Sequence, residues 1–261
     1  MAEPRPYTTQ LQAGLGMVDE TLGLLRVVRP GDTPTRLAER VVAQGLFART
    51  TARRARNIVV EMFSPRFLVH GDQPACWLQS LQAANTPTED LAQLFFLHTA
   101  RAQAIFADFI LQVYWPRYSA GAQVIHRSEA ETFIRRALDA GRMRKRWTNS
   151  TISRVSAYLL GCAADFGLLE GSGRTHRPIR HFSIRPRVAL YLAYELHFAG
   201  ATDMSLIHHR DWQLFGLAPQ EVLAQAKRLA NDGHWLVQSS ADLIQLSWKY
   251  RSMEEALRAI A

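Results

Sequence analysis

Residues 128–166 read SEAETFIRRALDAGRMRKRWTNSTISRVSAYLLGCAADF, and this stretch decides the fold. Apolar residues recur every three or four positions before and after a short basic segment, a period typical of amphipathic helices. The pattern predicts one helix over Ser128–Ala140 and a second over Asn149–Phe166, joined by a basic turn at Gly141–Trp147. Gly167 follows the second helix and suits the left-handed conformation that ends many helices.

A hairpin is predicted directly after these two helices. Gly171-Ser172-Gly173 reads as a turn, and apolar residues alternate with polar ones over Ile179–Ile184. We therefore expect a β-hairpin over Leu168–Ile184. Two helices followed by a hairpin is the element order of a winged helix-turn-helix, so residues 128–185 are predicted to form a winged-helix-like unit.

The rest of the chain also reads as mainly α-helical. Helix-start signals such as Thr33-Pro34 precede apolar residues at helical spacing. A second helix-and-hairpin unit is predicted within 203–261, with helices near His209–Phe215 and over Gln220–Asn231 and a hairpin over Trp235–Trp248. We expect an N-terminal helical bundle at 1–120 and a winged-helix-like C-terminal domain at 121–261, the boundary lying near Gly121, where the charge changes.

The positive charge of the chain is regional. The 261 residues carry a net charge of +8, while residues 135–187 alone hold twelve Arg or Lys and three acidic residues, a net of +9. The unit near the C-terminus has the opposite sign, with three basic and five acidic side chains over 203–248. A concentrated positive charge favours an anionic partner, so we expect nucleic acid to contact the basic unit and not the second one.

Three neighbouring elements supply the candidate contacts. The basic turn provides cations. The start of the second helix provides hydroxyls and free N–H groups, where the helix dipole favours phosphate. The hairpin provides arginines that can follow a nucleic-acid backbone or enter a minor groove. On the second helix Thr151, Arg154 and Tyr158 are expected to share an outward face. The predicted nucleic-acid-binding residues are Arg142, Arg144, Lys145, Arg146, Thr148, Ser150, Thr151, Arg154, Arg174, Arg177 and Arg180.

Motifs of catalysis, metal binding and export are not found in the sequence. It has no phosphate-binding G-x-x-x-x-G-K-[ST] loop, no G-x-S-x-G elbow and no H-E-x-x-H. Cys76 and Cys162 lie far apart without a His or Cys at ligand spacing, and the apolar stretch Leu91–Trp115 is interrupted by charged residues. We therefore expect a cytoplasmic, non-enzymatic protein with no catalytic residue, cofactor, metal or membrane contact.

Several stretches resemble one protein family in order and spacing. They are AGLGMVDETLGLL (13–25), GLFARTTARRARNIV (45–59), SPRFL (64–68), FADFILQVYWPRY (106–118), RWTNSTISRVSAYLLGCAADFGLL (146–169) and GHWLVQSSADLIQLSWKYRSMEEAL (233–257). Together they resemble the BrxA component of bacteriophage-exclusion (BREX) phage-defence systems over nearly the whole chain. Serine commonly follows the tryptophan matched by Trp147 in that family, and Thr148 keeps the hydroxyl here.

This resemblance implies a helical, non-enzymatic protein that is similar to the NusB antitermination factors over part of its length and binds double-stranded DNA. It also implies possible partners among the other BREX components: an AAA-type ATPase, an adenine methyltransferase and a phosphatase-like protein. We therefore expect a DNA-binding accessory protein of phage defence. A protein-interaction scaffold that docks on acidic defence partners, and an RNA-binding NusB-like factor, are the alternatives.

Overall fold

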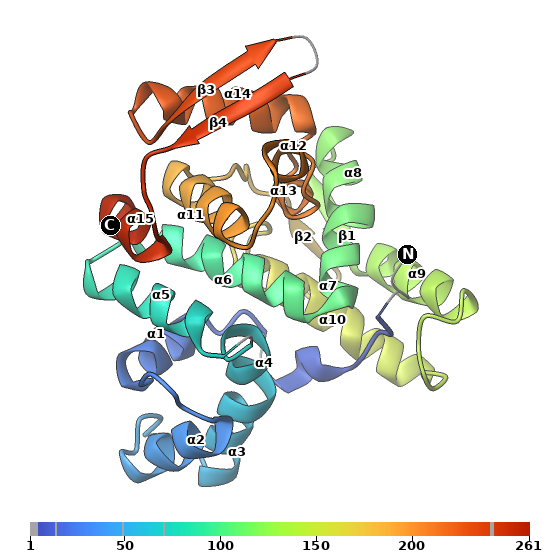
Figure 1. The fold of residues 1–261 in the computed structure, drawn as a ribbon. Coiled ribbons are helices and arrows are strands. Elements are labelled where there is room, and N and C mark those ends of the chain that lie inside the picture. The colour runs from blue at the N-terminus through green and yellow to red at the C-terminus, as the bar shows by residue number, and fades with distance from the viewer. Residues whose placement is uncertain (1–4, 14, 49, 70, 241–242) are drawn as a thin grey trace. The chain divides into compact units, whose positions relative to one another are not determined.

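The computed structural model describes residues 5–13, 15–48, 50–69, 71–240 and 243–261 (Figure 1). The chain divides into two compact units, each assembled from two segments. The first unit comprises Met1–Gln79 and Phe95–Phe182, and the second comprises Ser80–Leu94 and Ser183–Ala261. The boundary predicted near residue 120 lies inside the first unit. The described residues are mostly helical, as the sequence predicts.

The first unit is built almost wholly from helices. Those lying entirely within it are η1 (Gln10–Ala13), α1 (Val18–Val27), α2 (Pro34–Ala43), α3 (Ala52–Asn57), η2 (Ile58–Phe63), α4 (Ser64–Phe67), α7 (Ala104–Phe109), η3 (Ile110–Tyr114), α8 (Trp115–Ser119), α9 (Arg127–Asp139) and α10 (Asn149–Asp165). Two more helices, α5 (Gln73–Ala83) and α6 (Thr88–Ala102), run from one unit into the other.

Two long helices of the first unit each contain a wider, π-helical segment. The elements α3, η2 and α4 follow one another without a break, as do α7, η3 and α8. In each case the middle element, η2 or η3, is π-helical. Single π turns inside α-helices are uncommon and frequently mark functional sites.

The two helices predicted over Ser128–Ala140 and Asn149–Phe166 are confirmed. α9 begins at Arg127, one residue before the prediction, and His126 is its N-cap, with the His126 N–H donating to Glu129 Oε2 at 2.8 Å. α10 begins after Thr148, whose Oγ1 accepts a hydrogen bond from the Thr151 N–H at 3.2 Å. The apolar stripe of α10 is buried as expected, at Ile152, Val155, Leu159, Cys162 and Ala163.

The predicted hairpin over Leu168–Ile184 is confirmed in part. The Glu170 N–H donates to Pro178 O at 2.9 Å and the Arg180 N–H donates to Leu168 O at 3.0 Å, around an antiparallel bridge between Leu169 and Ile179. The sequence does not predict that β2 (His176–Pro178) also pairs antiparallel with β1 (Val124–His126), which lies before α9. Residues 180–185 are irregular. The alternation there has another cause, because Phe182 is buried and its ring lies 5.7 Å from that of Phe96.

An aromatic cluster forms part of the core of the first unit. Phe96, Phe106 and Phe166 meet with ring centroids 5.9 to 6.2 Å apart, and all three are buried. These residues come from α6, α7 and the end of α10. The cluster therefore fixes α10 against two helices that are distant from it in sequence.

The second unit contains the later helices and the predicted second hairpin. Its remaining elements are α11 (Pro186–Phe198), α12 (Asp203–Ile207), α13 (Asp211–Leu214), α14 (Pro219–Asn231), β3 (Trp235–Ser240), β4 (Leu243–Trp248) and α15 (Met253–Ile260). β3 and β4 pair antiparallel, with Trp235 opposite Trp248, which confirms the hairpin. Trp212, Phe215 and Trp235 are buried, so these aromatic residues form core.

The apolar stretch 91–115 folds into separate helices. α6 ends at Ala102, and the next helix begins at Ala104. Among the described residues, no single helix has both the length and the apolar composition of a membrane span, although Thr88–Ala102 and Ala104–Ser119 meet that test as a pair bent by 109°. His98 is buried within this stretch, and its ring lies 5.7 Å from that of Phe67.

Candidate nucleic-acid interface

The N-terminus of α10 presents a cluster of hydroxyl groups. Thr148 Oγ1 lies 2.9 Å from Ser150 Oγ and 3.0 Å from Thr151 Oγ1. Thr148 and Ser150 are exposed and Thr151 is half-buried. The first N–H groups of a helix are not used within it and attract anions, so this end of α10 is chemically suited to a phosphate oxygen.

The basic turn before α10 supplies three exposed cations, Arg144, Lys145 and Arg146. No carboxylate in the described part of the chain forms an ion pair with them. The backbone of the turn is held at its start, because the Tyr7 N–H donates to Arg142 O at 2.8 Å and Tyr7 bridges Met143. The three side chains are thus free to contact an anion while the turn itself is anchored.

Arg142 differs from the other cations of the turn. Its Nη2 lies 3.0 Å from Asp108 Oδ2, and its guanidinium lies over the Tyr7 ring, 4.5 Å from the centroid. The Tyr7 hydroxyl donates to the same carboxylate oxygen at 2.6 Å. Burial, and then this bond to Asp108, raise the pKa of Tyr7 far above its usual value. Arg142 is therefore engaged inside the protein, where it positions the start of the basic turn.

The outward face of α10 changes character along its length. Arg154 is exposed, and no ion pair involving it is found in the described ranges. One turn further on, Tyr158 lines a hollow with three carboxylates and one arginine, namely Asp19, Glu20, Asp165 and Arg54. Carboxylates repel a polyanion, so only the N-terminal half of α10 is electrostatically suited to nucleic acid.

The three arginines near β2 have different surroundings. Arg174 is exposed and has no ion-pair partner among the residues with described positions. Arg177 is half-buried and its Nη1 donates to Gly171 O at 2.7 Å, and burial lowers its pKa. Arg180 Nε lies 3.8 Å from Glu170 Oε1, and because both side chains are more than half exposed this pair contributes little.

Other cations of the basic segment are tied into the fold. In the second unit, both Arg185 and Arg187 contact Asp90, a carboxylate that is only 2% exposed. Arg135 Nη1 donates to Asn149 Oδ1 at 3.0 Å and so connects the helices α9 and α10. These contacts reduce the free positive charge to a smaller region than the sequence predicts.

Arg127 is a residue that the sequence analysis missed. Its guanidinium donates to the backbone oxygen and hydroxyl of Ser153, and its Nε donates to Ser156 Oγ at 3.3 Å. The Arg127 N–H also donates to Thr175 O at 2.8 Å. Arg127 therefore ties the start of α9 to the middle of α10 and to the loop before β2. No local pattern around Arg127 signals these long-range contacts.

Five exposed cations of the predicted interface have no ion-pair partner in the described ranges, and three of them directly precede α10. We define the cationic surface as the exposed, unpaired side chains Arg144, Lys145, Arg146, Arg154 and Arg174. It includes five of the eight basic residues predicted from the sequence. Of the other three basic residues, Arg142 holds the start of the basic turn, and Arg177 holds the loop before β2.

Comparison with known proteins identifies the family. None of the curated proteins searched matches the chain. The family model described as BrxA matches residues 5–195, which is well over half of the chain and includes the cationic surface. The chain therefore belongs to the BrxA family, the components of bacteriophage-exclusion phage-defence systems.

Proposed function

We propose that the protein is a non-enzymatic, cytoplasmic component of a BREX system that binds double-stranded DNA through the cationic surface. The observation that carries this proposal is the position of Arg144, Lys145 and Arg146, which are exposed and unpaired directly before the hydroxyl-rich N-terminus of α10. Cations and free N–H groups at one place fit the spaced phosphates of a nucleic-acid backbone.

The order of elements supports a winged-helix type of binding. β1, α9, α10 and β2 follow one another, and β1 pairs with β2 while Leu169 bridges Ile179. α10 then takes the place of the helix that enters the major groove, and the loop before β2 takes the place of the wing. Arg154 on the helix and Arg174 on the loop are the expected contacts outside the turn.

Duplex DNA is favoured over RNA by the shape of these contacts. A helix N-terminus bordered by cations fits the wide major groove of B-form DNA, whereas the deep, narrow major groove of double-stranded RNA does not admit side chains easily. Among the described Phe, Tyr and Trp side chains, none beside the cationic surface is exposed to stack unpaired bases, since Trp147 and Tyr158 are half-buried.

Family membership also supports a place among other defence components. We propose that the partners are the ATPase, the adenine methyltransferase and the phosphatase-like protein of the system. A role as a scaffold alone, with the cationic surface docked on an acidic partner, is the competing outcome that the following experiment distinguishes.

The test is fluorescence anisotropy with a short labelled duplex, in competition with unlabelled duplex DNA or structured RNA. The triple variant Arg144→Glu, Lys145→Glu, Arg146→Glu is expected to weaken duplex binding by on the order of a hundredfold, because three favourable charges become repulsive. The matched control is Arg36→Glu, Arg53→Glu, Arg56→Glu, which changes the net charge equally at exposed arginines on α2 and α3.

The control variant is expected to keep most of the binding, and unlabelled duplex is expected to compete better than RNA. No binding by the unmodified protein, or an equal loss in the two triple variants, would contradict DNA binding through this surface and favour the scaffold role. Plasmid incubated with protein and Mg²⁺ is expected to stay unnicked.

A further inference from the structure

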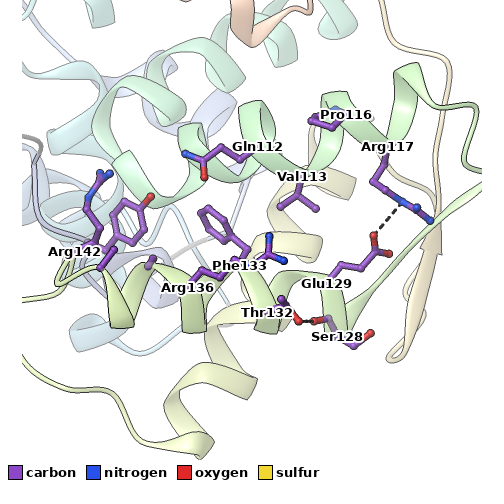
Figure 2. A pocket seen from close by; sticks show the side chains of 13 residues that line it. Gln112, Val113, Pro116, Arg117, Ser128, Glu129, Thr132, Phe133, Arg136 and Arg142 are labelled. Carbon is purple, nitrogen blue, oxygen red and sulfur yellow. Dashed lines mark hydrogen bonds and ion pairs between the residues drawn. The ribbon is translucent and has the colours of Figure 1, made fainter.

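The first unit contains a cavity that the proposed DNA contact does not use. Its volume is about 540 Å³, within the range of about 300–1,000 Å³ that small-molecule sites occupy. The cavity lies between the helix formed by η3 and α8 and the facing side of α9 (Figure 2). Its lining residues are Tyr7, Gln112, Val113, Pro116, Arg117, Ser128, Glu129, Thr132, Phe133, Arg136, Ala137, Ala140 and Arg142.

The cavity exists because two helix faces oppose each other without filling the space between them. The lining residues of α9 recur along one side of the helix, as do Gln112, Val113, Pro116 and Arg117 on the facing helix. The space is open to solvent, since lining residues such as Gln112, Thr132 and Arg136 are exposed. The π turn η3 carries Gln112 and Val113, and such turns are frequent at functional sites.

The cavity combines charged groups with apolar side chains. At one end Arg117 Nε lies 3.0 Å from Glu129 Oε1, so these charges offset each other. Arg142 and Gln112 lie toward the other end, and the Arg136 guanidinium lies between Phe133 and Val113 (Figure 2). A ligand there would meet apolar side chains beside a guanidinium.

One arginine at this cavity has unused hydrogen-bonding capacity. No carboxylate within the described ranges pairs with Arg136, which is exposed on α9. Arg142 differs, because its Nη2 is bonded to Asp108 and its Nε, although without a partner, is buried and closed to a ligand.

We propose that this cavity binds a small amphipathic anion, a molecule with one carboxylate, sulfonate or phosphate group on an apolar body. The anionic group contacts the Arg136 guanidinium, and the body contacts Phe133, Val113 and Pro116. One anionic group is specified because Glu129 at the far end repels a second. The inference is independent of DNA binding, since the free cations of the turn do not line the cavity.

The test compares two fluorescent probes that share an aromatic body and differ in charge. They are the anion 8-anilinonaphthalene-1-sulfonate and the neutral N-phenyl-1-naphthylamine. The anionic probe is expected to bind with a stoichiometry near one and more tightly than the neutral probe. Arg136→Gln is expected to weaken the binding of the anionic probe by about tenfold, because a charge-assisted hydrogen bond is lost. The affinity for the neutral probe is expected to stay unchanged.

Two further variants complete the test. Arg135→Gln is the matched control, since Arg135 is the adjacent exposed arginine of α9 and does not line the cavity. Ala140→Trp fills the cavity from an exposed position after α9, so it is expected to exclude both probes. An equal loss of the anionic probe in Arg135→Gln and Arg136→Gln, or full binding of both probes by Ala140→Trp, would overturn the proposal. Circular-dichroism melts establish that each variant is folded.

Discussion

Thr148 shows how one side chain at the start of α10 serves both the fold and the proposed contact. Its Oγ1 accepts from the Thr151 N–H at 3.2 Å and lies within 3.0 Å of two other hydroxyls. The sequence predicts this cap from its position before an apolar helical stripe. It does not predict that Arg142 meets Asp108 and Tyr7, since such contacts join residues far apart in the chain.

Replacing Thr148 with alanine removes the cap. Thr148→Ala is expected to lower the free energy of unfolding by about 1 kcal/mol, measured by urea denaturation, because the Thr151 N–H loses its acceptor. Thr148→Ser keeps the hydroxyl and is expected to stay close to the unmodified protein. A Thr148→Ala variant as stable as Thr148→Ser would show that the cap contributes nothing.

Gly16 lies where a larger residue has no room. Its N–H donates to Asp165 Oδ2 at 2.8 Å, and a Cβ at Gly16 would lie 2.4 Å from the Cβ of Asp165. Gly16→Ala is therefore expected to destabilise the protein by about 1–3 kcal/mol through overpacking. Gly23→Ala is the control, because a Cβ within α1 there meets its nearest neighbours at 3.9 Å. The expectation fails if the two variants melt alike.

Local sequence patterns predict the helices and the second hairpin but not the small sheet of the first unit. α9, α10, β3 and β4 follow from periodicity because each apolar stripe is complete within its own segment. β1 is three residues long, and its partner β2 lies beyond two intervening helices. The apolar alternation around Phe182 arises from burial against Phe96, which the segment itself does not reveal.

The elements of the second unit are expected to respond to pH. Burial lowers the pKa of His197 on α11 and of His234 before β3, so the folded state favours the neutral imidazoles. The contribution of these two histidines to folding stability is complete above the unfolded histidine pKa of about 6.5, and it is lost as the pH falls below that value. Tryptophan fluorescence during urea denaturation at about pH 7.5 and about pH 5.5 is expected to show lower stability in acid.

His197→Phe gives a control for this pH dependence. The His197 ring stacks on Trp248 with centroids 4.2 Å apart, and phenylalanine keeps the stack without titrating. The variant is expected to lose less stability between the two pH values than the unmodified protein. An identical loss in both proteins would mean that His197 does not cause the effect.

At the scale of the whole molecule, the net charge of +8 is distributed unevenly. The sequence predicts the positive region from the count of basic residues over 135–187. Which of those residues are free depends on partners elsewhere, such as Asp90 and Asp108, and these become visible only in the folded chain. Of the eight basic residues predicted to bind nucleic acid, the five that define the cationic surface are exposed and have no ion pair in the described ranges.

The salt dependence of duplex binding tests the account most directly. If the five free cations each replace a counterion, the slope of log affinity against log salt is expected to be about −4 to −5 for the unmodified protein. One triple variant, Arg144→Gln, Lys145→Gln, Arg146→Gln, removes three of these cations and is expected to reduce the slope to about −2. The control triple variant, Arg36→Gln, Arg53→Gln, Arg56→Gln, is expected to leave the slope unchanged. A flat dependence, or the same slope in all three proteins, would contradict phosphate binding by this surface.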